Sequence, residues 1–136
     1  MPPLSILLKP ASSGCNLRCA YCFYADEAKI RTIPNYGQMP EAVSHALIEK
    51  AAKAAERSVT FLFQGGEPTL AGLDFFRDFV AHVKKTAPPN LAVHYAIQTN
   101  GTLLDQEWCR FFKENRFLAG LSLDGSRECH NRFRLD

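Results

Sequence analysis

Segments with the twofold repeat of β-strands alternate along this chain with segments that have the spacing of amphipathic helices. Strand-like segments lie at 4–9, 58–64, 91–98 and 117–123. One helical segment begins at Pro40, and a second extends from about residue 73 to 85. A third follows Asp105, which we expect to cap it. Because strands that alternate with helices form parallel sheets with right-handed crossovers, we expect an α/β fold, either an open doubly wound sheet or part of a (β/α) barrel.

The two faces of each predicted strand differ in polarity. One face is bulky and apolar, as with Val59, Phe61 and Phe63, and suits contact with helices. The opposite face becomes polar where each strand ends, and these residues are Lys9, Gln64, Gln98 and Ser122. Because active sites of (β/α) barrels lie at the carboxyl ends of the strands, the pattern favours part of a TIM-like barrel, with about four strands and three helices, and a site at its mouth.

Composition excludes several classes of protein. The chain has 136 residues, which is long enough to form one core. Apolar residues make up 46% of it, which rules out a disordered chain. The net charge of +2 gives no electrostatic basis for binding nucleic acid or a membrane surface. The first nine residues lack the pattern of a secretory signal, and apolar runs are too short to span a bilayer. We therefore expect a cytoplasmic protein.

Three of the five cysteines lie within eight positions, directly after the first predicted strand. Cys15, Cys19 and Cys22 can converge on one metal centre, and soft sulfur ligands select zinc, copper(I) or iron-sulfur clusters. Structural zinc sites and electron-transfer 4Fe-4S clusters normally have four protein ligands, so three cysteines leave an open position for a chelating small molecule. Cys109 and Cys129 show no pairing signature, and we expect Cys109 to be a small buried residue.

The spacing Cys-x3-Cys-x2-Cys, with an aromatic residue before the last cysteine, resembles the signature of radical S-adenosylmethionine (SAM) enzymes. Gln64-Gly65-Gly66-Glu67-Pro68 resembles the Gly-Gly-Glu-Pro motif of the same family. The resemblance implies a 4Fe-4S cluster that reductively cleaves SAM to methionine and a hydrogen-abstracting 5'-deoxyadenosyl radical. It implies cluster ligation by Cys15, Cys19 and Cys22, and SAM binding by Tyr21, Gly65, Gly66, Glu67, Ser122 and Arg134.

A longer set of motifs is similar to the anaerobic sulfatase-maturating enzymes of this family. The segments are 9–17, 22–24, 63–73, 98–103 and 120–125. The resemblance implies oxidation of an active-site cysteine, or serine, of a sulfatase polypeptide to Cα-formylglycine, with electrons from a donor such as flavodoxin or ferredoxin. The residues that we expect to contact the substrate peptide are Tyr24, Gln64 and Gln98.

Members of this family are longer than 136 residues. The resemblance implies that residues 1–136 are the N-terminal part of the radical SAM core domain. The rest of the barrel, the acidic base and a SPASM-type domain with two auxiliary 4Fe-4S clusters would lie beyond residue 136. We expect the fragment alone to be poorly soluble or inactive. Two alternatives remain open, namely another SPASM-type peptide-modifying maturase and an inactive metal-binding module.

The four histidines receive no ligand role. His45 and His82 lie on predicted helices, and we expect solvent to surround both. His94 shares the strand face of Gln98, and we expect His130 to lie in a polar loop.

Overall fold

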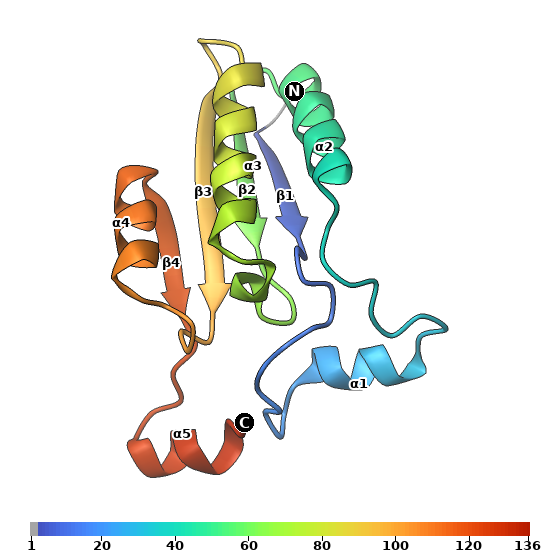
Figure 1. Ribbon diagram of the computed structural model, residues 1–136, viewed down its shortest axis with the longest axis vertical. Coiled ribbons are helices and arrows are strands. Elements are labelled where there is room, and N and C mark those ends of the chain that lie inside the picture. The colour runs from blue at the N-terminus through green and yellow to red at the C-terminus, as the bar shows by residue number, and fades with distance from the viewer. Residues whose placement is uncertain (1–2) are drawn as a thin grey trace.

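The computed structural model describes residues 3–136, which form a single parallel sheet with helices (Figure 1). The strands are β1 (Leu4–Leu8), β2 (Ser58–Phe63), β3 (Ala92–Thr99) and β4 (Phe117–Leu121). The helices are α1 (Phe23–Ile30), α2 (Glu41–Ala54), α3 (Leu73–Thr86), α4 (Gln106–Glu114) and α5 (Arg127–Phe133), with a short 3₁₀ helix at Pro68–Ala71. Met1 and Pro2, the first residues of the segment in which we expected no secretory signal, lie outside the described residues.

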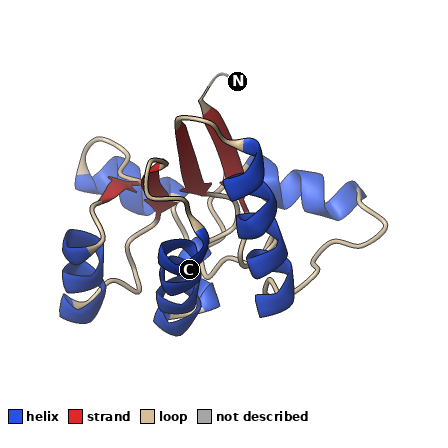
Figure 2. Cartoon of the chain, turned by 90° about the horizontal axis from the view of Figure 1, so that it is seen from above, coloured by secondary structure: helices blue, strands red, loops and turns tan. Residues whose placement is uncertain are grey.

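The sheet has the strand order β1-β2-β3-β4, and each neighbouring pair is parallel. All four carboxyl ends therefore point to the same edge, where α1 and α5 also lie (Figure 1). Helices α2, α3 and α4 cover one face of the sheet (Figure 2). This arrangement confirms the predicted parallel α/β fold, and it brings the loops that follow the strands to one end of the molecule.

The core lies between the sheet and the three covering helices, and aromatic rings make up much of it. Phe61 and Phe63 of β2 have ring centroids 5.1 Å from that of Phe79 in α3. Phe63 also lies 4.9 Å from Phe76, and all four rings are fully buried. The apolar face predicted from strand parity is therefore the face that packs on the helices.

The predicted elements are confirmed with small differences at their ends. The strand predicted at 91–98 is Ala92–Thr99, and the strand predicted at 117–123 ends at Leu121. Pro40 is the N-cap of α2 rather than its first residue, and Asp105 caps α4 with hydrogen bonds from Glu107 N and Trp108 N. Two helices were not predicted. Neither α1 nor α5 has a buried residue, so neither carries an apolar stripe that a sequence pattern can detect.

The expectations about three side chains were wrong. Cys109 is exposed, because α4 buries Trp108, Phe111 and Phe112 and turns Cys109 away from the core. His45 and His82 are half-buried rather than solvated, because their rings stack on each other between α2 and α3.

No helix among residues 3–136 is long and apolar enough to cross a membrane.

Removing an aromatic ring from this core should destabilise the fold strongly. We expect Phe79→Ala to lower the free energy of unfolding by about 3–5 kcal/mol, since it leaves a cavity beside Phe61 and Phe63. Tyr36→Ala removes a ring of similar size that is exposed, and it should change stability by no more than about 0.5 kcal/mol. Urea denaturation followed by circular dichroism measures both, and equal effects would contradict the proposed core.

Candidate functional site

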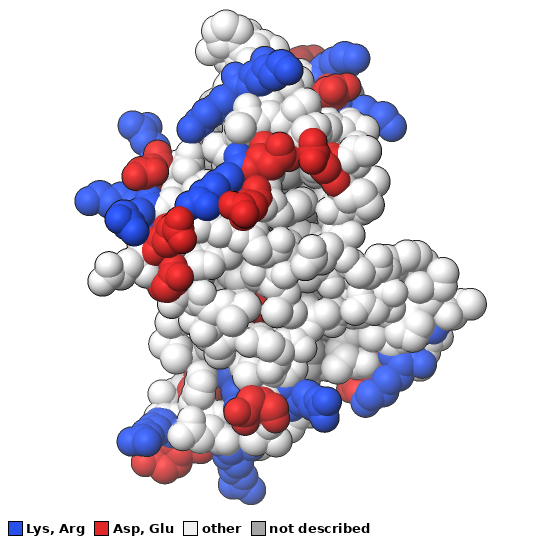
Figure 3. All heavy atoms as spheres, in the orientation of Figure 1, with Lys and Arg blue, Asp and Glu red and all other residues white. Residues whose placement is uncertain are grey.

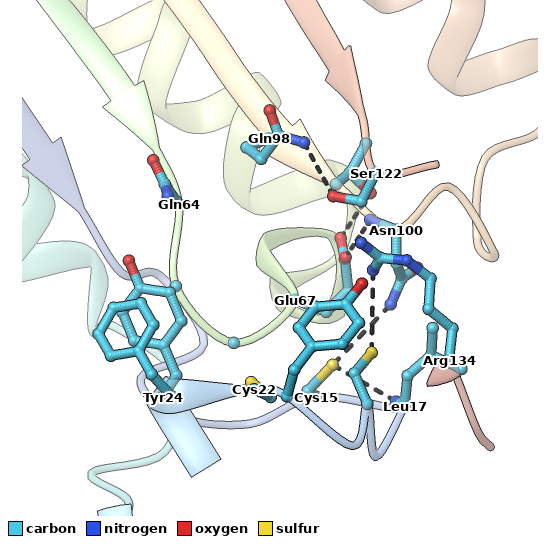
Figure 4. A pocket seen from close by; sticks show the side chains of 16 residues that line it. Cys15, Leu17, Cys22, Tyr24, Gln64, Glu67, Gln98, Asn100, Ser122 and Arg134 are labelled. Carbon is cyan, nitrogen blue, oxygen red and sulfur yellow. Dashed lines mark hydrogen bonds between the residues drawn. The ribbon is translucent and has the colours of Figure 1, made fainter. Parts of the chain in front are cut away.

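A cavity of about 220 Å³ lies at the carboxyl edge of the sheet, between the strand ends and the loop that follows β1 (Figure 4). Cys15, Cys19 and Cys22 form its wall on the loop side. Gln64 and Gln98 approach from the ends of β2 and β3 on the opposite side. The polar strand ends therefore converge as strand parity predicted, with one exception. Lys9 does not line the cavity, and its Nζ lies 4.4 Å from the centroid of the Tyr24 ring.

Every residue to which the family resemblance gave a role lines this one cavity. These residues are Cys15, Cys19, Tyr21, Cys22, Tyr24, Gln64, Gly65, Gly66, Glu67, Gln98, Ser122 and Arg134. Leu17, Phe23, Thr99 and Asn100 also line it and were not among the predicted site residues. Asn100 follows β3 immediately, so its place after a strand end is the signal that marks it.

The cysteine loop is held in place by backbone hydrogen bonds from two distant segments. On one side Glu67 N donates to Gly14 O at 2.7 Å. On the other side, Arg18 N and Ala20 N donate to carbonyls at the end of the chain, Leu135 O and Phe133 O. Cys22, the last cysteine, is the N-cap residue of α1. Contacts across the whole sequence therefore fix the positions of the three thiols.

Nitrogen donors approach two of the cysteine sulfurs. Leu17 N lies 3.4 Å from Cys15 Sγ, Asn100 Nδ2 lies 3.9 Å from the same sulfur, and Arg134 Nη1 lies 3.8 Å from Cys19 Sγ. Partial burial raises the pKa of the Cys15 thiol, while the Leu17 hydrogen bond acts in the opposite direction and the charge of Glu67 adds to the increase. A bound metal reverses this balance, because a coordinating thiol loses its proton.

These contacts fit the expected iron-sulfur cluster. Donors directed at sulfur stabilise its negative charge and tune the potential of a cluster. The three thiols, the only cysteines that line the cavity, supply soft ligands of the kind that clusters require.

The carboxylate of Glu67 joins two loops at the edge of the sheet. Only 1% of Glu67 is exposed. Its Oε1 accepts hydrogen bonds from Thr69 N at 3.0 Å, Thr69 Oγ1 at 2.7 Å and Thr99 Oγ1 at 2.7 Å. Its Oε2 accepts one from Asn100 N at 2.7 Å, which leaves room on Oε2 for one further donor.

The two glycines before Glu67 allow a close approach of backbone segments. Gly65 and Gly66 have φ values of 103° and 58°, which side-chain-bearing residues rarely adopt. A Cβ atom on Gly66 would lie 2.2 Å from Gly14 O, the acceptor that ties the cysteine loop to this segment. Gly66 is therefore required by the packing of the loop itself, in addition to any role toward a ligand.

A charged network closes the side of the cavity next to α5. Asp124 accepts hydrogen bonds from Arg134 Nε at 2.9 Å, from Arg134 Nη2 at 3.2 Å, and from the Tyr21 hydroxyl. The Tyr21 bond, followed by the Arg134 bond, holds the pKa of Asp124 below its usual value. Sequence reasoning missed Asp124, and its position directly after the last strand segment was the available signal. Nearby, Gln98 Nε2 donates to Ser122 Oγ at 2.8 Å.

Comparison with known proteins gives a family match over nearly the whole chain. The family model of the radical SAM superfamily matches residues 10–134. The chain is 52% identical over 136 residues to a cysteine-type anaerobic sulfatase-maturating enzyme of Clostridium novyi (strain NT), covering 100% of this chain and 36% of the relative. It is 38% identical over 138 residues to a serine-type anaerobic sulfatase-maturating enzyme of Klebsiella aerogenes, covering 98% of this chain and 33% of the relative.

Solved structures agree with this match. Native anSMEcpe with bound AdoMet superposes with a TM-score of 0.92 at 48% sequence identity, covering 98% of this chain and 36% of that chain. Native anSMEcpe with bound AdoMet and Kp18Cys peptide gives a TM-score of 0.91 at 47% sequence identity, covering 99% of this chain and 36% of that chain. The chain thus spans about a third of the length of the relatives that it matches.

Alanine at Gly66 should disrupt the contact between the two loops. We expect Gly66→Ala to lower the free energy of unfolding by roughly 3 kcal/mol or more, because the new Cβ meets Gly14 O. Gly37 has a similar φ of 75° and no neighbouring atom within 4 Å among the described residues, so Gly37→Ala carries the backbone strain alone, about 1 kcal/mol. Thermal unfolding of both variants separates the two effects, and equal losses would exclude the close approach.

Proposed function

The chain belongs to the radical SAM superfamily, and from that membership we propose that it carries the part of an anaerobic sulfatase-maturating enzyme that binds the cluster and SAM. The reaction proposed for the whole protein is oxidation of a sulfatase cysteine, or serine, to Cα-formylglycine. One observation carries the proposal: the cysteine trio and the Gly-Gly-Glu-Pro segment line one cavity in a chain that is 52% identical to an enzyme of that name. Higher identity to the cysteine-type than to the serine-type relative favours cysteine as the target residue.

Cys15, Cys19 and Cys22 are the proposed ligands of a 4Fe-4S cluster. When bound, the cluster and SAM supply the one-electron chemistry that removes a hydrogen atom from the substrate. The chain's own contribution is to position these groups and to limit access of water. The donors at Leu17 N, Asn100 Nδ2 and Arg134 Nη1 balance negative charge on the sulfurs.

The proposed SAM contacts surround the cluster ligands. Gly65 and Gly66 present backbone without side chains, and the free position on Glu67 Oε2 suits the ammonium group of the methionine moiety. Tyr21 is the proposed neighbour of the adenine, and Ser122 of the ribose or carboxylate. Arg134 already pairs with Asp124 through Nε and Nη2, so contact with the SAM carboxylate would use Nη1.

Tyr24, Gln64 and Gln98 are the proposed contacts of the substrate peptide. Gln98 donates its amide hydrogen to Ser122, which fixes the amide plane and leaves the carbonyl oxygen available as an acceptor for a peptide N–H. Tyr24 packs on Phe23, with ring centroids 4.1 Å apart, and lies beneath the ammonium of Lys9. These contacts give the ring a fixed position at the mouth.

We propose further that residues 1–136 are the N-terminal part of a radical SAM core domain. The acidic base and the two auxiliary 4Fe-4S clusters of a SPASM-type domain would then be supplied by other parts of the protein. A flavodoxin or ferredoxin is the proposed electron donor, and the fragment alone is proposed to be inactive on sulfatase peptides. The length of the relatives, of which this chain spans about a third, supports this division.

Anaerobic reconstitution with iron and sulfide should load the cysteine trio. We expect roughly four irons per chain, broad visible absorption, and dithionite-dependent release of 5'-deoxyadenosine from SAM. Cys15→Ala, Cys19→Ala and Cys22→Ala should each abolish the deoxyadenosine. Cys109→Ala, which removes an exposed thiol on α4, should behave like the unsubstituted chain. Stable zinc binding without iron uptake would reject the radical reaction and favour a metal-binding module.

The whole protein that contains this sequence should convert a cysteine-containing sulfatase peptide to the formylglycine product. Mass spectrometry should show replacement of the thiol and one Cβ hydrogen by a carbonyl oxygen, and a hydrazide reagent should capture the new aldehyde. A serine peptide serves as the comparison, with slower conversion expected from the higher identity to the cysteine-type relative. A thioether-linked product would instead assign the protein to another class of peptide maturase.

A further inference from the structure

Two histidines and two carboxylates meet on the outer surface of α2 and α3, away from the cysteine cavity. Glu41 and His45 are one helical turn apart on α2, and Asp78 and His82 are one turn apart on α3. None of these four residues lines the cavity that holds the cysteines. In Figure 3 acidic side chains gather over the face where α2 and α3 lie side by side.

The two imidazole rings are stacked, with centroids 3.7 Å apart and planes 7° apart. Imidazole is a common metal ligand through either of its ring nitrogens. The side chains of His45 and His82 are only 24% and 15% exposed, so packing restricts the orientation of both rings.

His45 lies between two carboxylates that come from different helices. Its Nε2 is 2.7 Å from Asp78 Oδ2, and its Nδ1 is 3.9 Å from Glu41 Oε1. One ligand atom from each of Glu41, His45 and Asp78 can be chosen so that all three lie within 4.8 Å of one another. Bonds of about 2.0–2.2 Å to one ion place its ligands roughly 3–4 Å apart, so Asp78 Oδ2 must move slightly away from His45 Nε2 and Glu41 must rotate toward the ion. The side chains of Glu41 and Asp78 are 74% and 42% exposed, which leaves both room to rotate.

We propose that Glu41, His45 and Asp78 bind a divalent ion of the zinc class, with water in the remaining positions. One imidazole and two carboxylates are borderline and hard ligands, which suit such ions and differ from the soft thiols of the cysteine cavity. Glu49, whose Oε1 lies 3.6 Å from His82 Nε2, adds a third carboxylate to the surroundings and increases the attraction for a cation. The ion would link α2 to α3 on the face opposite the sheet.

Zinc counting on the iron-loaded chain tests this site, because iron then occupies the proposed cluster ligands. After equilibrium dialysis against Zn²⁺, elemental analysis of zinc and iron should give about one zinc more per chain for the unsubstituted protein than for His45→Gln. Glu41→Gln alters only an exposed side chain, so it should fold normally and weaken zinc binding roughly tenfold or more. Iron content should be the same in all of these proteins.

His94→Gln is the matched control, since His94 is an exposed histidine on β3 and is not one of the proposed zinc ligands. It should bind as much zinc as the unsubstituted protein. Nuclear magnetic resonance of the histidine rings gives a second measurement, in which Zn²⁺ should shift the ring signals of His45 and leave those of His94 in place. Equal zinc content in the unsubstituted protein, His45→Gln and Glu41→Gln would overturn the proposal, as would an equal loss in His94→Gln. Neither result would bear on the proposed SAM chemistry, because deoxyadenosine release tests that chemistry separately.

Discussion

The buried carboxylate of Glu67 is the contact on which the arrangement of the cavity depends. Its two oxygens accept four hydrogen bonds from three residues, Thr69, Thr99 and Asn100, which lie in the 3₁₀ helix after β2 and at the end of β3. A buried carboxylate without such donors would be strongly destabilising, so the donors and the charge require each other. The same residue's backbone N–H holds the cysteine loop through Gly14 O. The side chain and the backbone amide of Glu67 therefore connect three loops at the edge of the sheet.

The cysteine loop has few buried side chains of its own, so its position comes from its partners. Gly66 permits the approach on one side, since any Cβ there would collide with Gly14 O. The hydrogen bonds to Phe133 O and Leu135 O, together with the Arg134 to Asp124 pair, hold the other side. A loop fixed from both sides can keep three thiols directed at one space without a disulfide or a buried core beneath it.

The alternation of strands and helices predicted the fold, and strand parity predicted part of the site, because both depend on local pattern. Gln64, Gln98 and Ser122 follow from the alternation of side chains and from the parallel order that aligns strand ends. The functional assignments of Tyr21, Glu67 and Arg134 came from resemblance to a family, since pattern alone does not distinguish a ligand contact from a structural one. Contacts between side chains of different helices could not be predicted from the sequence. The stacking of His45 on His82 depends on how α2 packs on α3, and no periodicity within either helix encodes it.

The uncovered face of the sheet follows from the same architecture. Parallel sheets are normally covered on both faces, yet helices α2, α3 and α4 cover only one face of this sheet in residues 3–136. On the opposite face Leu118 is 75% exposed and Leu7 is 50% exposed, which is unfavourable for apolar side chains in water. Closure of a barrel would bury this face inside its wall and would place the carboxyl ends of all strands around one mouth. The proposed core domain therefore accounts for the exposed leucines and for the position of the cysteine cavity by one arrangement of the chain.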